Sequence, residues 1–253
     1  MIIVAAILAA IAALALIAAR PSTYKVFPDA HIKELDFLDF DYLKNLDKDI
    51  IITYSPPDAV DIDTKTKKMS IKKYIKKYLD KPEWYFKCED SYDFLDEIGV
   101  KQNIVESFNE KFPHRFVTDR RLSFWVGGKN TTTAYHTDID DMMYLYVVKG
   151  KKKLTLIPPE DTKYMYSQRY PFSRWTPINF KDVDLKKYPL YEKATKHEII
   201  LNAGDSLFIP PHWWHCVENL EPTIALTYKV YRFHHFFLTF IPEFVYSLFH
   251  QKT

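Results

Sequence analysis

The chain has 253 residues, of which 47% are hydrophobic and 16% aromatic, and this content is enough to bury one substantial core. The formal net charge is only +2, so the composition gives no global electrostatic reason to expect a nucleic-acid-binding protein. Two cysteines, Cys88 and Cys216, cannot form a disulfide framework, and this favours a reducing compartment.

An unbroken apolar run occupies residues 2–19 and ends at Arg20. Its length reaches the lower limit for a bilayer-spanning helix, which is about 17–25 residues. A cleaved signal peptide is disfavoured because no basic segment precedes the run, and a buried core helix is disfavoured because no face of the run is polar. Residues 1–20 are therefore predicted to be a transmembrane anchor. The basic residues Arg20 and Lys25 follow the run, which predicts a single-pass membrane protein whose body faces the cytosol.

Residues 21–120 are predicted to form a linker and then helices and strands that flank a barrel. The β-branched run at 49–54 indicates a strand, and Ser70 is placed to cap a helix whose apolar residues recur at helical spacing. Seven lysines between residues 65 and 77 would form a basic surface around this helix. A solvated helix face, a site for anionic lipid headgroups and a nucleic-acid contact are three interpretations of that surface.

Short strand-like runs dominate residues 121–232. Four of the five glycines of the chain fall in this region, each beside such a run, as expected for turns between strands. The predicted fold is mostly β, a double-stranded β-helix of the jelly-roll or cupin type with flanking helices. Residues 233–253 are aromatic and apolar but are interrupted by Pro242 and Glu243, so a C-terminal helical segment is predicted there rather than a second membrane span.

His136 and Asp138 are two positions apart, and the alternation of side chains along a strand puts them on one face. A second imidazole, His215, follows the proline- and tryptophan-rich residues 210–214. Two histidines and one carboxylate on one face bind a divalent metal and leave the opposite positions open, as in non-haem Fe(II) oxygenases. A hydrogen-bonded core histidine and an Asx turn are the alternative for the His-x-Asp pattern alone, and His212 is a rival for His215.

Three segments resemble the JmjC/cupin-like (cupin-8 type) branch of the Fe(II)/2-oxoglutarate-dependent dioxygenases. They are SFWVGGKNTTTAYHTD at 123–138, KGKKKLTLIPP at 149–159 and AGDSLFIPPHWWHCVE at 203–218, in the order in which the family has them. The pattern is most similar to the asparaginyl hydroxylases that act on hypoxia-response proteins. The resemblance implies that iron is held by His136, Asp138 and His215, since the family places its last ligand after the paired tryptophans.

The co-substrate that the resemblance implies, 2-oxoglutarate, needs a cation for the carboxylate that does not bind iron. Strand parity puts Lys152 on one face with Leu154 and Leu156, and the apolar neighbours indicate that this face is buried. A buried lysine needs a counter-ion, which the carboxylate of the co-substrate would supply. The family pattern selects the same lysine.

The resemblance also implies a contact between the co-substrate and the hydroxyl of Thr133. Tyr144 and Tyr146, on the strand between the metal motif and Lys152, are further candidates, of which Tyr144 is preferred. An asparagine that the family pattern has on the last strand is absent, and a residue such as Tyr228 stands in its place.

Together these features favour a membrane-anchored Fe(II)/2-oxoglutarate dioxygenase that hydroxylates a side chain of a protein or peptide substrate. An N-methyl-lysine demethylase would use the same oxidant. A catalytically inactive jelly-roll scaffold protein at a membrane, and a membrane-surface adaptor that uses the lysine-rich helix, are alternatives from other classes. No nucleic-acid partner is expected. In related hydroxylases a C-terminal helical segment makes the dimer, so residues 233–253 are expected either to form a homodimer or to pack on the barrel, with interfacial membrane contact as the alternative.

Overall fold

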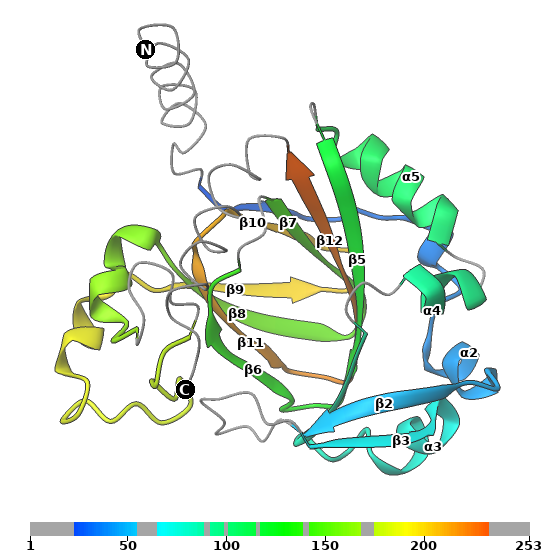
Figure 1. Cartoon of the computed structure of the whole chain (residues 1–253), viewed down its shortest axis with the longest axis horizontal. Helices are drawn as coiled ribbons and strands as arrows, with labels where there is room; N and C mark the ends of the chain where they lie inside the picture. The colour runs from blue at the N-terminus through cyan, green and yellow to red at the C-terminus, as the bar shows by residue number, and fades with distance from the viewer. Residues whose placement is uncertain are drawn as a thin grey trace, which may run out of the picture.

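The structure, a computed structural model, describes residues 23–54, 65–88, 92–98, 101–114, 117–138, 142–167 and 175–232. Two antiparallel sheets face each other, and the α-helices lie on the outer side of the larger sheet (Figure 1). Within these ranges no helix is long and apolar enough to cross a bilayer. The predicted anchor at residues 1–20 and the predicted C-terminal segment at 233–253 fall outside the described residues.

In the described ranges the larger sheet has eight strands, in the order β1-β10-β7-β12-β5-β4-β2-β3. Every neighbouring pair is antiparallel. Their bounds are β1 Lys25–Phe27, β10 Ser206–Ile209, β7 Met142–Lys149, β12 Thr223–Arg232, β5 Val117–Gly127, β4 Trp84–Cys88, β2 Asp49–Tyr54 and β3 Thr66–Ser70.

The smaller sheet has four strands among the described residues, in the order β6-β11-β8-β9, again antiparallel. Their bounds are β6 Thr132–His136, β11 Trp214–Asn219, β8 Lys151–Ile157 and β9 His197–Asn202. Apolar side chains from both sheets meet between them, including Leu145, Leu154 and Leu156. The prediction of a mostly β, double-sheet fold is confirmed, because strands of period two bury one face of each sheet against the other.

Four short α-helices pack on the larger sheet among the described residues: α2 Phe40–Asn45, α3 Ile71–Lys77, α4 Tyr92–Glu97 and α5 Lys101–Lys111. The 3-10 turn η1, Lys33–Leu35, joins the same apolar layer. Ser70 caps α3 as predicted, since its hydroxyl oxygen accepts a hydrogen bond of 3.3 Å from the backbone N–H of Lys73.

A third apolar cluster covers the outer face of the smaller sheet. It is formed by Trp214, Tyr135 and Ile157 from the strands and by residues of the connection that contains η2, Pro159–Tyr164, and η3, Pro189–Lys193. The part of the smaller sheet around β6 and the first half of β11 is therefore buried on both faces, whereas the outer face of β9 is exposed. The inner face of the smaller sheet looks toward the larger sheet, and the candidate site lies on that inner face.

Candidate metal centre

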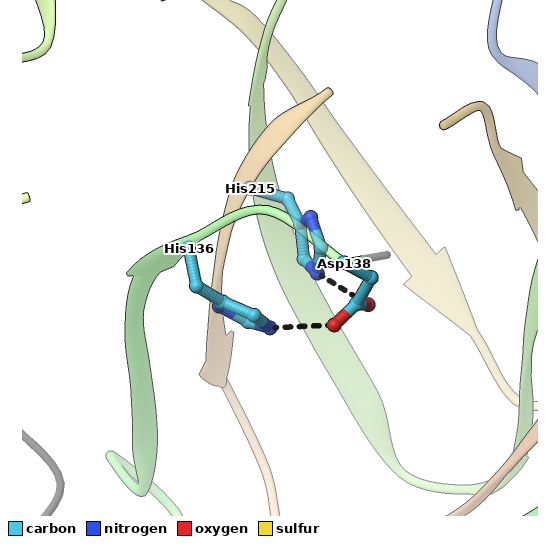
Figure 2. A group of neighbouring side chains, drawn as sticks. All are labelled: His136, Asp138 and His215. Carbon is cyan, nitrogen blue, oxygen red and sulfur yellow. Dashed lines mark ion pairs between the residues drawn. The ribbon is translucent and has the colours of Figure 1, made fainter. Parts of the chain in front are cut away.

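Three side chains converge on the inner face of the smaller sheet (Figure 2). β6 and β11 are neighbours, and His136 lies directly opposite His215 in their register. Asp138 follows β6 by two residues, and its Oδ1 and Oδ2 lie 3.8 Å from His136 Nε2 and 3.5 Å from His215 Nε2. One ligand atom from each residue lies within 4.8 Å of the other two. The structure therefore brings the three predicted ligands together.

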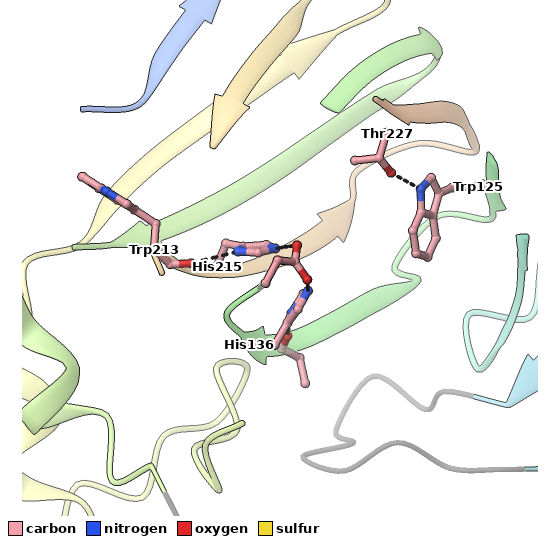
Figure 3. Close-up of polar contacts among 7 residues, drawn as sticks. Trp125, His136, Trp213, His215 and Thr227 are labelled. Carbon is pink, nitrogen blue, oxygen red and sulfur yellow. Dashed lines mark hydrogen bonds and ion pairs between the residues drawn. The ribbon is translucent and has the colours of Figure 1, made fainter. Parts of the chain in front are cut away.

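Each imidazole is held by the backbone carbonyl of the residue two positions earlier in the chain. His136 Nδ1 lies 2.8 Å from the oxygen of Ala134, and His215 Nδ1 lies 3.1 Å from the oxygen of Trp213 (Figure 3). A carbonyl oxygen only accepts, so Nδ1 carries a hydrogen in each ring, and Nε2 is the nitrogen that faces Asp138. Burial, and to a smaller extent the neighbouring His136 ring, lowers the pKa of His215 to about 4. His215 is thus a neutral imidazole at pH 7, the form that binds a metal.

The geometry of the group fits a divalent first-row metal. The separations of 3.5 and 3.8 Å between nitrogen and oxygen exceed those of good hydrogen bonds. They suit atoms that each lie about 2.0–2.2 Å from a common ion. Two neutral imidazoles and one carboxylate on one side of the ion leave its opposite positions open, which is the ligand set of non-haem Fe(II) sites.

Lys152 lies on the same inner face of the smaller sheet. In the register of β8 and β11, Leu156 is opposite His215 and Lys152 is opposite Asn219. The side chain is 2% exposed, as strand parity predicted, and its Nζ donates a 2.8 Å hydrogen bond to Asn219 Oδ1. Burial lowers the pKa of the Lys152 ammonium to about 7. No carboxylate forms an ion pair with it in the part of the chain that the structure describes.

Thr133 reaches this face through a bulge in β6. It pairs with Val217 while His136 pairs with His215, so a step of three residues on β6 matches a step of two on β11. Regular alternation would have put Thr133 and His136 on opposite faces, and the bulge puts them on the same one. Thr133 pairs with Val217, which lies between His215 and Asn219 along β11, so Thr133 lies between the metal group and Lys152.

A model of the Cupin-like domain family matches residues 33–232. The chain belongs to this family. Its domain is of the JmjC type and is related to the 2-oxoglutarate oxygenases.

Two groups of curated proteins are similar to this chain. Over 132 residues it is 37% identical to HSPB1-associated protein 1 of Homo sapiens and 36% identical to that of Rattus norvegicus. Each match covers 51% of this chain, and it covers 26% of the human protein and 27% of the rat protein. Over 149 residues it is 32% identical to tRNA wybutosine-synthesizing protein 5 of Homo sapiens, covering 54% of this chain and 46% of that protein. The matched part spans less than half the length of these relatives.

Tyr144 lies elsewhere in the cupin-like domain. Its ring stacks on Phe112 with centroids 4.2 Å apart, and its hydroxyl lies 2.9 Å from His114 Nε2 in the layer under the helices. The neighbours Met143 and Leu145 take the inner positions of β7. The expectation that Tyr144 contacts the co-substrate is therefore not supported by its position, and Tyr146 packs in the same outer layer.

Tyr228 also faces the helices, where it stacks on Phe108 with centroids 4.9 Å apart. It does not take the inner position expected for a co-substrate contact, because alternation along β12 gives that position to Thr227. The hydroxyl oxygen of Thr227 accepts a hydrogen bond from Trp125 Nε1, on the side of the barrel across from the metal group (Figure 3).

The two tryptophans before His215 separate onto opposite faces. Trp214 points outward and donates a 3.0 Å hydrogen bond to Thr162 Oγ1, so it belongs to the outer cluster and does not line the metal group. Trp213 packs between the sheets. The wall beside His136 is Trp175, whose ring stacks on it with centroids 5.2 Å apart. His212 is exposed in the turn and lies outside the ligand group.

Two inner residues escaped the sequence analysis, Tyr85 and Asn219. On β4, the residues on either side of Tyr85 pack in the outer layer, so Tyr85 points to the inner face. Its ring centroid lies 5.7 Å from that of Trp125. A Cβ on Gly127 would lie 2.7 Å from Asn219 Nδ2 and 3.0 Å from Tyr85 Cε2, so the two side chains meet over this glycine. Burial raises the pKa of the Tyr85 phenol, and no hydrogen bond to it is seen among the described residues. Strand parity was the signal available for both.

Proposed function

We propose that this protein is an Fe(II)- and 2-oxoglutarate-dependent dioxygenase that hydroxylates a side chain of a protein or peptide substrate. The observation that carries the proposal is one inner face that bears both the His136, Asp138 and His215 group and a buried lysine without a counter-charge among the described residues. Membership of the cupin-like family and its relation to the 2-oxoglutarate oxygenases support it.

The metal would be held by His136 Nε2, His215 Nε2 and the carboxylate of Asp138. Bound Fe(II) would supply the activation of O2 that couples decarboxylation of 2-oxoglutarate, to succinate and CO2, to hydroxylation of a C–H bond. The protein fixes the two imidazoles through their Nδ1–H groups, which prevents either ring from turning its lone pair away. Trp175, stacked on His136, keeps bulk water from one side of the group.

The separation between the metal group and Lys152 matches a short dicarboxylate. On β8, Leu156 pairs with His215, and Lys152 lies four residue steps away, which is about 13–14 Å of extended strand. The stem of Lys152 covers part of that distance, and a five-carbon diacid that chelates the metal at one end would cover the rest. Thr133, in the intermediate row, would donate its hydroxyl to the far carboxylate, and Tyr85 offers a further phenol. An anion there would raise the pKa of Lys152 and so bind with uptake of a proton.

A protein substrate is supported by one group of relatives, whose name records an association with the protein HSPB1. Hydroxylation of asparagine, and oxidation of an N-methyl-lysine, are two outcomes that the same site would allow. The name of the other group refers to wybutosine synthesis in tRNA, so a tRNA substrate is the competing class that a substrate screen has to include. The anchor at 1–20, the cytosolic orientation and a homodimer through 233–253 remain predictions from the sequence.

The test is oxygen-dependent formation of succinate by the full chain supplied with Fe(II) and 2-oxoglutarate, with and without peptide and tRNA libraries. We expect Asp138→Ala to abolish it, since losing a ligand weakens metal binding by more than the roughly 10–100-fold that outer contacts cost. Tyr144→Phe is the control, because Tyr144 packs under the helices, on the other face of its strand from the metal group. Bound iron without any turnover would instead favour the inactive scaffold.

A further inference from the structure

Asn219 connects Lys152 to the end of the barrel. It is the last residue of β11, is 1% exposed and lies directly opposite Lys152. Its Oδ1 accepts the 2.8 Å hydrogen bond from Lys152 Nζ, and its Nδ2 donates a 3.2 Å hydrogen bond to the backbone oxygen of Gly128. The carbonyl of Gly128 can only accept, so it fixes which end of the amide faces the lysine.

The backbone of Asn219 is fixed as well. Its N–H donates to the oxygen of Thr131 at 2.9 Å, and its own oxygen accepts from the N–H of Asn130 at 2.8 Å. Asn130 has a φ of 65°, a left-handed conformation that asparagine tolerates better than most residues. Together with the Gly128 contact, these bonds hold the amide oxygen at one place, against which the flexible stem of Lys152 is aligned.

No charge in the described residues competes with Asn219 for Lys152. Its neighbours Lys151 and Lys153 point to the other face and pair there with Glu221 and Glu198. Across β8 on the side of β9, Lys152 meets Leu201, which is apolar. Among the described residues, the ammonium is therefore positioned by a single neutral oxygen.

We propose that Asn219 is a positioning residue that aims the Lys152 ammonium at a ligand carboxylate and, by being neutral, leaves its charge for that ligand. This rests on the proposed function for the identity of the ligand, a dicarboxylate. An aspartate at 219 would keep the shape of the side chain but place a negative charge against Nζ, so it would occupy the lysine and repel the ligand. An alanine would leave Lys152 unaligned.

The test compares the full chain with Asn219→Asp and Asn219→Ala, each loaded with Mn²⁺ as a metal that does not turn over. Binding is measured by calorimetry for 2-oxoglutarate and for 2-oxobutanoate, which has the same chelating end but lacks the far carboxylate. We expect both variants to weaken 2-oxoglutarate binding roughly 10–100-fold, the range for a hydrogen bond to a charged group, and to leave 2-oxobutanoate binding unchanged. Equal losses for both ligands, or no loss for either, would overturn the proposal.

A second measurement separates this proposal from the proposed function. The pKa of Lys152 is followed by ¹³C NMR of labelled lysine in the metal-free chain, with Lys152→Arg used to assign the signal. We expect Asn219→Asp to raise this pKa by more than one pH unit. If the wild-type chain binds no 2-oxoglutarate, the dioxygenase proposal fails while the titration still decides whether Asn219 controls Lys152. An unchanged titration in Asn219→Asp, whose shape is native, would refute the positioning role by itself.

Discussion

Replacing the buried lysine with an apolar residue of similar length should stabilise the ligand-free protein, and the gain should depend on pH. Lys152 has no counter-ion in the described residues, and its pKa falls from 10.5 to about 7 on folding because of burial. At about 1.36 kcal/mol for each pH unit, a lowering of this size costs about 5 kcal/mol at or below pH 7. Lys152→Met removes this cost but leaves the amide oxygen of Asn219 without a donor, which costs about 1–3 kcal/mol.

The net expectation at pH 7 is a gain of about 2–4 kcal/mol in the free energy of unfolding. Between pH 7 and about 10.5 the unfolded wild-type chain binds a proton that the folded chain does not, so wild-type stability rises with pH. The advantage of Lys152→Met must therefore shrink over this interval and reverse above it, where both states of the lysine are neutral and only the cost of the amide remains.

The assay is urea unfolding of both proteins without metal or ligand at pH 6, 7, 8, 9 and 10, and the quantity of interest is the difference between them. Titration of all other groups cancels in this difference. Lys153→Met is the matched control, since Lys153 lies on the outer face and pairs with Glu198. A difference for Lys152→Met that stays constant over the whole range would refute the claim that the ammonium is desolvated.

Two further comparisons use pairs of equivalent substitutions. Gly204→Ala should lower the free energy of unfolding by about 1–2 kcal/mol, because its φ is +92° and nothing lies within 4 Å of the new Cβ. Gly150→Ala should lower it more, because the same backbone strain at φ +81° is joined by a contact of 2.0 Å between the new Cβ and the oxygen of Pro222. Thermal unfolding checks this order, and equal costs would contradict it. Tyr85→Phe should weaken 2-oxoglutarate binding roughly 2–10-fold, the range for a neutral hydrogen bond, while Tyr144→Phe should leave it unchanged. A loss of binding confined to Tyr144→Phe would show that the inner and outer faces of the larger sheet were assigned wrongly.

The features that depend on local alternation could be predicted from the sequence. The spacing of two between His136 and Asp138 predicts that they share a face of a strand, and it does so without any knowledge of the fold. The same alternation puts Lys152 on one face with its neighbouring leucines. The N-cap at Ser70 is local in the same sense, since the bond that defines it spans three residues. The resemblance supplied the one long-range element, which is the pairing of His215 with the His136 motif.

The features that the sequence did not predict correctly are those that depend on tertiary structure. β7 is buried on both faces, so its run of large apolar residues carries no polar alternation to show which face Tyr144 takes. Asn219 acquires its contact with Lys152 only through the register of β11 against β8, which is set by distant pairing. The three-against-two step in β6 has no signature in the sequence, and a parity argument applied to Thr133 would have placed it wrongly.

That irregular step also limits how this strand can vary in length. Because three residue steps on β6 already match two on β11, deleting one residue between Thr133 and His136 would give regular pairing with both side chains still on the inner face. Inserting one residue would instead widen the mismatch to four steps against two and move one of the two side chains away from its partner on β11. A single deletion there should therefore be tolerated better than a single insertion, although every named side chain is retained in both. The length of this segment is thus constrained more strongly in one direction than in the other.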